Sequence, residues 1–355
     1  MRSQNPQPCR LDDVVPQTGG ERGVALKWGL VGLGSLGQLL SPAFAAAHNG
    51  QLVACASRTY RQAEGFAREH RVARAYPSYR ELVRDPEVEA VYVATPNHLH
   101  YPVVMAAAAA GKQVLCEKPM APTTTEAEEM VDACRSAGVM LRIGFYLRFL
   151  PVVQAAASAV RDGRLGDVLE LTVQRASGQG VLATWRQDLA TAGAGVLADV
   201  GVHLVDIAQV VVGEPVTRAF ALARPPRSSG LPDETMTALL EFPGGCQATV
   251  RCSRNLASGS NDLQVFGTRG TLASGPLRWV DDYRLTYRTR EGSEEKRFPA
   301  EDLYRLEIES FAEELSGGRT VAATGEEGLQ TVRVTEALIR SLETGASVEV
   351  ESPRL

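Results

Sequence analysis

Aspartate and histidine side chains on one predicted helix are the first residues in this chain that suggest chemistry. Asp199, His203 and Asp206 stand at i, i+4 and i+7, and this spacing places them on one helix face. A histidine beside carboxylates can act as a general acid or base, because they set its orientation and its pKa. The spacing alone slightly favours a simpler interpretation, a helix cap with a hydrogen-bonded histidine. No third ligand with a motif of its own accompanies them, so we expect no metal.

Three glycines near the start of the chain have the spacing of a dinucleotide-binding loop. Gly32, Gly34 and Gly37 form a G-x-G-x-x-G pattern between an apolar run and a helical pattern. The first glycine permits a tight turn, the second lets the backbone approach a pyrophosphate, and the third lets the helix lie near the strand. Free N–H groups at the helix N-terminus would bind the phosphates. We therefore expect Ser35 and Leu36 to belong to the cofactor site.

Lys118 stands directly after another apolar run and before Pro119. Ligands of parallel sheets bind at the carboxyl ends of the strands, so an ammonium group at this place would point toward a bound ligand. It could polarise a substrate oxygen or hold the ribose next to a nicotinamide. The alternative is a solvated surface lysine, which is less expected at this end of a strand.

The residues after the second apolar run bear on the choice of cofactor. An acidic side chain about 20 residues beyond the glycine loop usually binds the ribose 2′-hydroxyl of NAD. This chain has Ser57-Arg58-Thr59 there, with no carboxylate before Glu64. Because an arginine and hydroxyl groups can bind a 2′-phosphate, the sequence favours NADP(H), with NAD(H) as the alternative.

Two further strand ends should converge with the glycine loop. They are the segments 95–98 and 117–119, which follow apolar runs. Asn97 could contact the cofactor there. The residues themselves suggest that His98 and His100 pack within the loop.

Short apolar runs alternate with helical patterns in the first half of the chain. The runs are continuously apolar, as is typical of strands in a parallel sheet with helices on both faces. We predict an α/β Rossmann domain over 25–148. Its strands, besides the run before the glycine loop, are expected over 52–56, 74–76, 90–94, 113–116 and 140–144.

The second half shows alternating apolar and polar residues, which indicates a sheet with one solvated face. We predict an α+β substrate-binding domain over 149–355, with an open, mainly antiparallel sheet. Turn signals at 243–245 and 268–270 join pairs of strands. Strands are expected over 168–174, 235–242, 246–253, 262–266 and 278–288, and helices over 151–162, 197–212, 308–315 and 326–342.

The overall composition excludes several classes of protein. A chain of 355 residues is longer than one core usually supports, so two domains are expected. A net charge of -5 without a basic block argues against nucleic acid or an anionic membrane as partner, and no apolar run reaches the ~18 residues of a membrane span. Residues 1–24 are polar and are expected to form a disordered tail. The 6 cysteines include no C-x-x-C pair, which fits free thiols in a reducing cytoplasm.

Several separated motifs together resemble the glucose–fructose oxidoreductase / inositol dehydrogenase / MocA (Gfo/Idh/MocA) family. The resemblance runs from about Lys27 to Leu342, and the order of its motifs makes it specific. One mild departure is Gly193-Ala-Gly195, where the family often has three glycines. The motifs are Gly32-Leu-Gly34-Ser-Leu-Gly37, Ala94-Thr-Pro-Asn97 with His100, Gly111-Lys-Gln-Val-Leu-Cys-Glu117-Lys118-Pro119, Gly144-Phe-Tyr-Leu-Arg148-Phe-Leu-Pro151, Trp185-Arg186, and Gly193-Ala-Gly195-Val-Leu-Ala-Asp199-Val-Gly201-Val-His203-Leu-Val-Asp206.

This resemblance implies a nicotinamide-dependent oxidoreductase that acts on a secondary alcohol or ketone of a sugar, nucleotide sugar, aminocyclitol or related polyol. It implies that Lys118 contacts both the substrate oxygen and the cofactor. His203 would be the general acid or base, and Asp199 would assist it or bind substrate hydroxyls. Taken together, the strand ends and this resemblance predict a set of cofactor-binding residues. They are Gly32, Gly34, Ser35, Leu36, Ser57, Arg58, Thr95, Pro96, Asn97, His100, Glu117 and Lys118.

The sequence says less about which residues contact the substrate than about those that bind the cofactor. The resemblance implies Lys118, Asp199 and His203, and with them Tyr146, Arg148, Trp185 and Arg186. The pair Trp185-Arg186 fits a pocket wall and plain packing equally well. Arg148, Arg175 and Arg186 could bind an anionic group, such as the diphosphate of an activated sugar, or could serve structure alone.

Partners and alternatives follow from the same resemblance. Family members are usually dimers or tetramers joined through the open face of the second sheet, so we expect a homodimer or homotetramer. Some relatives use bound NAD to cleave glycosidic bonds, which makes a glycosidase of the same fold the first alternative. The second is a non-catalytic dinucleotide-binding sensor, which would be expected to lose Lys118 or His203.

Overall fold

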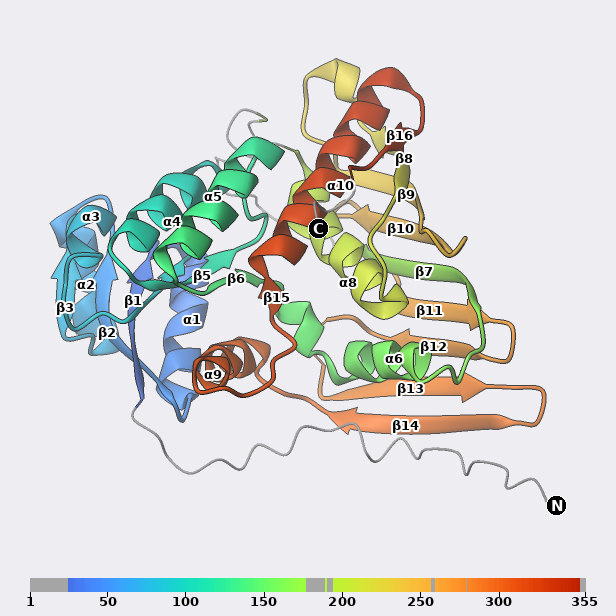
Figure 1. Cartoon of the computed structure of the whole chain (residues 1–355), viewed down its shortest axis with the longest axis horizontal. Helices are drawn as coiled ribbons and strands as arrows, with labels where there is room; N and C mark the ends of the chain where they lie inside the picture. Colours follow the sequence, from blue (N-terminus) through green and yellow to red (C-terminus); the bar gives the residue numbers. More distant parts are fainter. Residues whose placement is uncertain (1–24, 177–188, 190–193, 257–258, 279, 352–355) are drawn as a thin grey trace.

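Two sheets form the framework of the chain, one in each half (Figure 1). The structure, a computed structural model, describes residues 25–176, 189, 194–256, 259–278 and 280–351. The tail predicted over 1–24 lies outside these residues, as do Trp185 and Arg186. The first sheet is mostly parallel and the second mostly antiparallel, which confirms the predicted fold class.

The first sheet is a Rossmann sheet of seven strands in the order β15-β6-β5-β4-β1-β2-β3. Strands β1 to β6 are parallel to one another, and β15 alone runs antiparallel. Their apolar runs are buried because helices cover both faces. The strands are β1 (Leu26–Val31), β2 (Gly50–Ala56), β3 (Arg74–Tyr76), β4 (Ala90–Val93), β5 (Gln113–Glu117), β6 (Leu141–Gly144) and β15 (Ala323–Thr324).

The connecting helices begin and end at residues that the sequence marks. Helix α5 begins at a side-chain cap, because the Thr123 side chain accepts a hydrogen bond from the Glu126 N–H, and it ends at Gly138 with a φ of 65°. None of the described helices is both long and apolar enough to cross a membrane. The helices of this half are α1 (Ser35–Ala46), α2 (Tyr60–His70), α3 (Tyr79–Leu82), α4 (His100–Ala109) and α5 (Thr124–Ala137).

The second sheet has nine strands in the order β14-β13-β12-β11-β7-β10-β9-β8-β16, and only its β7–β10 pair is parallel. One face packs on helices α6 (Pro151–Arg161), α8 (Val202–Val212) and α10 (Gly325–Thr344) (Figure 1). Both predicted turns are confirmed, because they join β9 to β10 and β11 to β12. The strands are β7 (Val168–Ala176), β8 (Arg218–Arg224), β9 (Thr235–Glu241), β10 (Gln247–Ser253), β11 (Asn261–Gly267), β12 (Thr271–Gly275), β13 (Asp282–Arg288), β14 (Ser293–Pro299) and β16 (Val348–Glu349).

The C-terminal part of the chain returns to the first sheet. Helix α9 (Leu303–Leu315) packs on α1, and β15 pairs with the β6 edge. Helix α10 then lies between α5 on one side and β8 on the other (Figure 1). The halves predicted over 25–148 and 149–355 are therefore interlocked, and the boundary between them stays a prediction.

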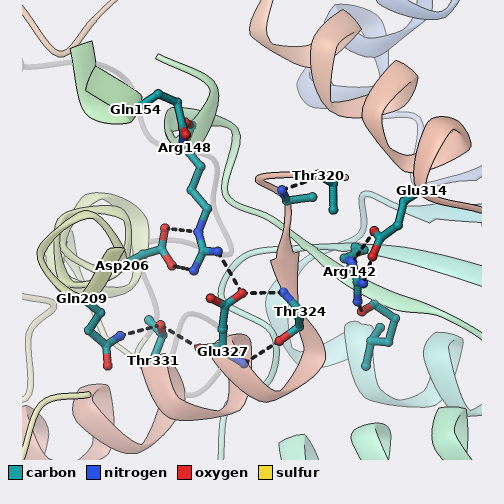
Figure 2. A network of polar contacts seen from close by, with 12 residues as sticks. Arg142, Arg148, Gln154, Asp206, Gln209, Glu314, Thr320, Thr324, Glu327 and Thr331 are labelled. Carbon is teal, nitrogen blue, oxygen red and sulfur yellow. Dashed lines mark hydrogen bonds and ion pairs between the residues drawn. The ribbon is translucent and has the colours of Figure 1, made fainter. Parts of the chain in front are cut away.

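A buried ion-pair network stabilises the segment in which the chain first passes from one sheet to the other (Figure 2). Arg148 lies there in a short helical turn, η3 (Tyr146–Phe149). Its guanidinium donates to both carboxylate oxygens of Asp206 in α8, at 2.8 and 2.5 Å, and to Glu327 in α10 at 2.9 Å. Glu327 also closes the capping box of α10 with Thr324. The network thus fixes three segments that are far apart in sequence.

A second buried cluster joins α9 to strands β4 and β5 of the Rossmann sheet. The Tyr92 hydroxyl lies 2.9 Å from a carboxylate oxygen of Glu117 and 3.1 Å from one of Glu307. One hydroxyl carries one proton, so it can donate to only one of these groups, and the other must carry a proton of its own. Burial, and then the negative charge of Glu117, raise the pKa of Glu307 well above its ordinary value. Glu307 is therefore the group that is held as a neutral acid.

This assignment predicts how Glu307→Gln changes the pH dependence of stability. A carboxyl whose pKa is raised on folding takes up a proton, so the wild type should lose stability as pH rises above the unfolded pKa of about 4.3. The slope is about 1.4 kcal/mol per pH unit until the folded pKa is reached. Glutamine keeps the shape without this dependence. The stability of Glu307→Gln relative to the wild type should therefore increase from pH 5 to pH 8, as measured by thermal unfolding. Parallel curves would show that Glu307 is ionised in the folded protein.

Candidate active site

The glycine loop has the geometry of a dinucleotide site. Gly32 has a φ of 104°, and a Cβ on it would lie 2.4 Å from the Ala94 carbonyl oxygen. A Cβ on Gly37 would lie 2.7 Å from the Gly32 oxygen. These two glycines are needed by the fold itself, for the turn and for the close helix. A Cβ on Gly34 would meet nothing within 4 Å, so the space beside this glycine is open to a ligand. The loop therefore fits a bound dinucleotide.

The end of β2 presents an arginine beside this loop. The Gly32 N–H donates to the Ala56 carbonyl at 3.2 Å, which brings the two strand ends together. Arg58 is exposed and forms no ion pair with any of the residues the structure describes. Ser57 donates to Gln62 at 3.0 Å, and Thr59 caps helix α2. Arg58 is thus placed to meet an anionic group at the ribose end of a dinucleotide.

His100 connects the ends of β4 and β5. Its ring is fully buried, with Nδ1 at 2.9 Å from the Pro119 carbonyl and Nε2 at 2.9 Å from the Thr95 carbonyl. Both nitrogens are therefore used inside the protein. The structure agrees with the loop-packing role that the residues suggested, and it argues against the cofactor contact that the family resemblance implied. His100 holds the segments that carry Asn97 and Lys118.

Glu117 also points inward. Its side chain is bonded to the Tyr92 hydroxyl and accepts a hydrogen bond from the Lys118 N–H at 3.2 Å. Only 5% of its surface is exposed. This placement argues against a direct contact of the Glu117 carboxylate with a cofactor, and assigns it instead to the support of Lys118.

Lys118 joins the two halves at the predicted site. Its ammonium donates to the backbone carbonyl of Asp199 at 2.6 Å and lies 3.8 Å from the Asp199 carboxylate. Arg254 approaches the other carboxylate oxygen of Asp199 at 3.7 Å. The Asp199 carboxylate thus lies between a cation from the first sheet and a cation from the second. The structure thus brings together Lys118 and Asp199, two of the predicted site residues.

The helix that carries Asp199 differs from the prediction. Residues Leu197–Gly201 form a π-helical segment, η5, and the α-helix α8 begins only at Val202. Asp206 does not stand beside His203 as a catalytic partner, because its carboxylate is committed to Arg148. The single face predicted from the i, i+4, i+7 spacing is therefore divided between the site and the buried network.

His203 is buried and neutral. Its ring packs edge-on between Phe145 and Tyr146, at centroid distances of 5.9 and 5.0 Å, and is 2% exposed. Burial, and then the charges of Lys118 and Arg175, lower the pKa of His203 well below its ordinary value. Its Nδ1 has no hydrogen-bond partner in the described part of the chain. A neutral imidazole has a nitrogen lone pair and can accept a proton from a ligand that reaches its ring.

Asp233 is a functional residue that sequence reasoning missed. It lies before β9, and its carboxylate accepts hydrogen bonds from the Gly195 N–H at 2.8 Å and the Leu197 N–H at 2.9 Å. A Cβ on Gly195 would lie 2.0 Å from the Asp233 carbonyl oxygen. Gly195 was thus the available signal, since a glycine there indicated that the backbone approaches something closely. Asp233 anchors the segment that presents Asp199 and His203.

The predicted substrate-binding residues differ in what they contact in the structure. Tyr146 lies beside His203, and its hydroxyl accepts hydrogen bonds from both terminal nitrogens of Arg175 at 3.3 Å. Arg148 was expected to bind substrate, and the structure corrects this. Its side chain is 5% exposed, and its guanidinium binds Asp206 and Glu327. Trp185 and Arg186 lie outside the described residues.

Comparison with known proteins gives matches for both halves. Residues 26–145 match the family profile described as "Oxidoreductase family, NAD-binding Rossmann fold". Residues 153–273 match "GFO/IDH/MocA C-terminal domain".

Three relatives span nearly the whole chain. The 1,5-anhydro-D-fructose reductase of Ensifer adhaerens is 30% identical, over 92% of this chain and 99% of its own. The D-xylose 1-dehydrogenase (NADP(+)) 2 of Haloferax volcanii is 34% identical, over 92% and 100%. The crystal structure of the aldose-aldose oxidoreductase of Caulobacter crescentus superposes with a TM-score of 0.83 at 29% identity, over 92% and 100%.

The open space at Gly34 leads to a prediction about ligand binding. Gly34→Ala should leave the melting temperature almost unchanged, because its φ of -76° suits alanine and the Cβ meets no protein atom. The new methyl group would occupy the space that a pyrophosphate needs, so the Kd for a nicotinamide dinucleotide should rise about tenfold or more. Fluorescence titration and thermal unfolding measure the two effects.

Gly65→Ala is the matched control. Gly65 lies in helix α2, and its Cβ would also meet nothing within 4 Å. Alanine should stabilise the helix by up to about 1 kcal/mol and leave dinucleotide binding unchanged. Equal dinucleotide affinity in the Gly34→Ala protein would contradict the assignment of this loop.

Proposed function

The chain belongs to the Gfo/Idh/MocA family of NAD(P)-dependent oxidoreductases, and from this premise we propose that it moves a hydride between a nicotinamide cofactor and a secondary alcohol or ketone of a sugar, nucleotide sugar, aminocyclitol or related polyol. The observation that carries the proposal is the contact of Lys118 with Asp199, four residues before His203. A strand end of the cofactor domain and the helix with the proton carrier meet there. The named relatives act on sugars, which supports the substrate class.

The residues that would hold the cofactor come from the strand ends of the first sheet. The segment Gly32 to Leu36 would bind the pyrophosphate, Ser57 and Arg58 the adenosine ribose, and the segment 95–97 the nicotinamide side. When bound, the nicotinamide supplies the chemistry of accepting or giving a hydride at C4.

The protein's own groups move the proton. In oxidation, neutral His203 takes the proton of the substrate hydroxyl while the carbon loses its hydride, so that the alcohol becomes a ketone. The Lys118 ammonium donates a hydrogen bond to the same oxygen and stabilises its developing negative charge. Asp199 holds Lys118 and binds neighbouring hydroxyl groups. In reduction, the same groups return the proton to the oxygen.

We favour NADP(H) over NAD(H) as the cofactor. Arg58 is exposed at the end of β2, without an ion pair among the described residues, and a guanidinium suits a 2′-phosphate. The Haloferax relative carries NADP(+) in its name.

We also propose a homodimer or homotetramer that forms through the open face of the second sheet. Leu222 and Leu239 point away from the helices on neighbouring strands and are 65% and 53% exposed. Exposed leucines of this kind are typical of association surfaces.

The function is tested by a screen of sugars, cyclitols and nucleotide sugars with NADPH and NADP⁺, combined with two variants. Lys118→Ala should lower kcat by roughly two orders of magnitude or more, because the oxygen loses its charged donor. His203→Ala should remove the loss of oxidation rate at acid pH, a loss that the wild type shows only below pH 6.5 because the pKa of His203 is lowered.

Lys27→Ala serves as the control, since Lys27 forms a surface ion pair with Glu87 and should not affect kcat. Undiminished turnover in Lys118→Ala would overturn its assignment. Sugar release without net change in nicotinamide absorbance would indicate the glycosidase instead.

Arg58 gives a separate prediction about the cofactor. Arg58→Gln should lower the ratio of kcat/KM with NADP⁺ to kcat/KM with NAD⁺ by about tenfold or more, because one charged contact to phosphate contributes roughly 1.5–3 kcal/mol. Steady-state kinetics with both cofactors measures the ratio. If Arg58→Gln kept the wild-type ratio, Arg58 would not be the residue that binds the 2′-phosphate.

A further inference from the structure

Two arginines of the second sheet lie at the same end as the catalytic groups. Arg175 is near the end of β7, and Arg254 directly follows β10. The two strands are neighbours and parallel, with Arg175 opposite Cys252. The positions two and four residues before each arginine are buried in the core, so alternation turns both arginines to the helix-covered face.

Contacts confirm that this face meets the active site. Arg254 approaches the Asp199 carboxylate at 3.7 Å. Arg175 donates to the hydroxyl of Tyr146, whose ring packs against His203. Both guanidinium groups are therefore next to the residues assigned to substrate.

Among the described side chains at this place, the positive charges outnumber the negative ones. Lys118, Arg175 and Arg254 are cationic, and Asp199 is the carboxylate that lies between two of them. Asp233 lies nearby, but its carboxylate accepts two backbone N–H groups at the start of η5. Among the described residues, Lys118 and Arg254 thus share one side-chain carboxylate, and Arg175 has none within ion-pair distance.

Burial makes this excess costly. Arg254 is 9% exposed, and its Nε has no hydrogen-bond partner in the described part of the chain. Arg175 forms no ion pair there and is bonded through its guanidinium to a tyrosine hydroxyl. Arg148, which is buried to a similar extent as Arg254, has two carboxylates. Arg254 shares its carboxylate with Lys118, and the half-buried Arg175 has none among the described residues, so negative charge from a ligand would stabilise both guanidinium groups.

We propose that Arg175 and Arg254 bind an anionic substituent of the substrate, so that the preferred substrate is an acidic sugar or polyol with a carboxylate or phosphate group. The planar guanidinium fork matches both of these oxyanions. The inference rests on the proposed hydride transfer and adds the charge of the substrate. The sugars in the names of the two sequence relatives, anhydrofructose and xylose, carry no such group.

The first test uses the wild-type enzyme and matched sugars. D-glucose, D-glucuronate and D-glucose 6-phosphate form one series, and D-galactose with D-galacturonate forms a second, each followed with NADP⁺ and NAD⁺. We expect kcat/KM for at least one acidic sugar to exceed that of its neutral parent by tenfold or more. The uronates and the phosphate ester separate the two kinds of anion.

The second test uses variants and the ratio of acidic to neutral kcat/KM. This ratio should fall tenfold or more in Arg175→Met and in Arg254→Met, and Arg175→Lys should retain part of it. Arg161→Met is the control, because Arg161 is on the surface helix α6 with a side chain 73% exposed, and its ratio should stay unchanged. Thermal unfolding checks that each variant is folded. If Arg254→Met does not fold, the comparison of Arg175→Met with Arg175→Lys decides the test.

The outcomes separate this inference from the function on which it rests. A neutral parent that is turned over as well as its acids, or an unchanged ratio in Arg175→Met, overturns the anionic substrate and leaves the hydride transfer intact. No change in nicotinamide absorbance with any sugar of either series overturns the proposed function and the inference with it.

Discussion

The buried pairing of Arg148 with Asp206 is the interaction on which the rest of the site depends. It forms where the chain first crosses between the sheets, and its second carboxylate comes from the capping box of α10 (Figure 2). Because the planar guanidinium fork donates to both oxygens of a carboxylate in one geometry, it fixes the rotation of α8. That rotation directs Asp206 into the network and leaves His203 facing Tyr146 and the Lys118 side. If α8 were rotated differently, His203, the proposed proton carrier, would point away from the cofactor domain.

Three further internal contacts hold the site from other sides. The Glu117 carboxylate accepts a hydrogen bond from the Lys118 N–H, and His100 bonds to the segments that follow β4 and β5. Asp233 accepts a backbone hydrogen bond just before η5. None of these side chains needs to touch a ligand. They give Lys118 and His203 fixed positions, which is what catalysis by a charged donor and a proton carrier requires. Family motifs therefore contain residues that position the site as well as residues that react.

Sequence reasoning succeeded where a residue's neighbours in the chain decide its role. The apolar runs and the three glycines predicted the Rossmann sheet, because strand, turn and helix are local. It failed where the partner is distant. Arg148 meets Asp206 and Glu327, which lie 58 and 179 residues away, and no local pattern reveals that pairing. Strand β14 lies at an edge of the sheet, where charged residues can occupy both of its faces. It therefore lacks the alternation of apolar and polar residues that would have predicted a strand. Asp233 lies in a loop, and only the glycine that it touches indicated its presence.

The electrostatics of the site also connect substrate charge with proton transfer. Arg175 is one of the charges that lower the pKa of His203, after burial and Lys118. An anion bound beside Arg175 would offset that charge, and the pKa of His203 would rise toward the neutral range. A proton carrier works best when its pKa is near the working pH. An acidic substrate would therefore improve the base that removes its own proton, whereas a neutral sugar would leave His203 a weaker base. The arginines thereby give a physical reason for selection by charge that acts on turnover as well as on binding.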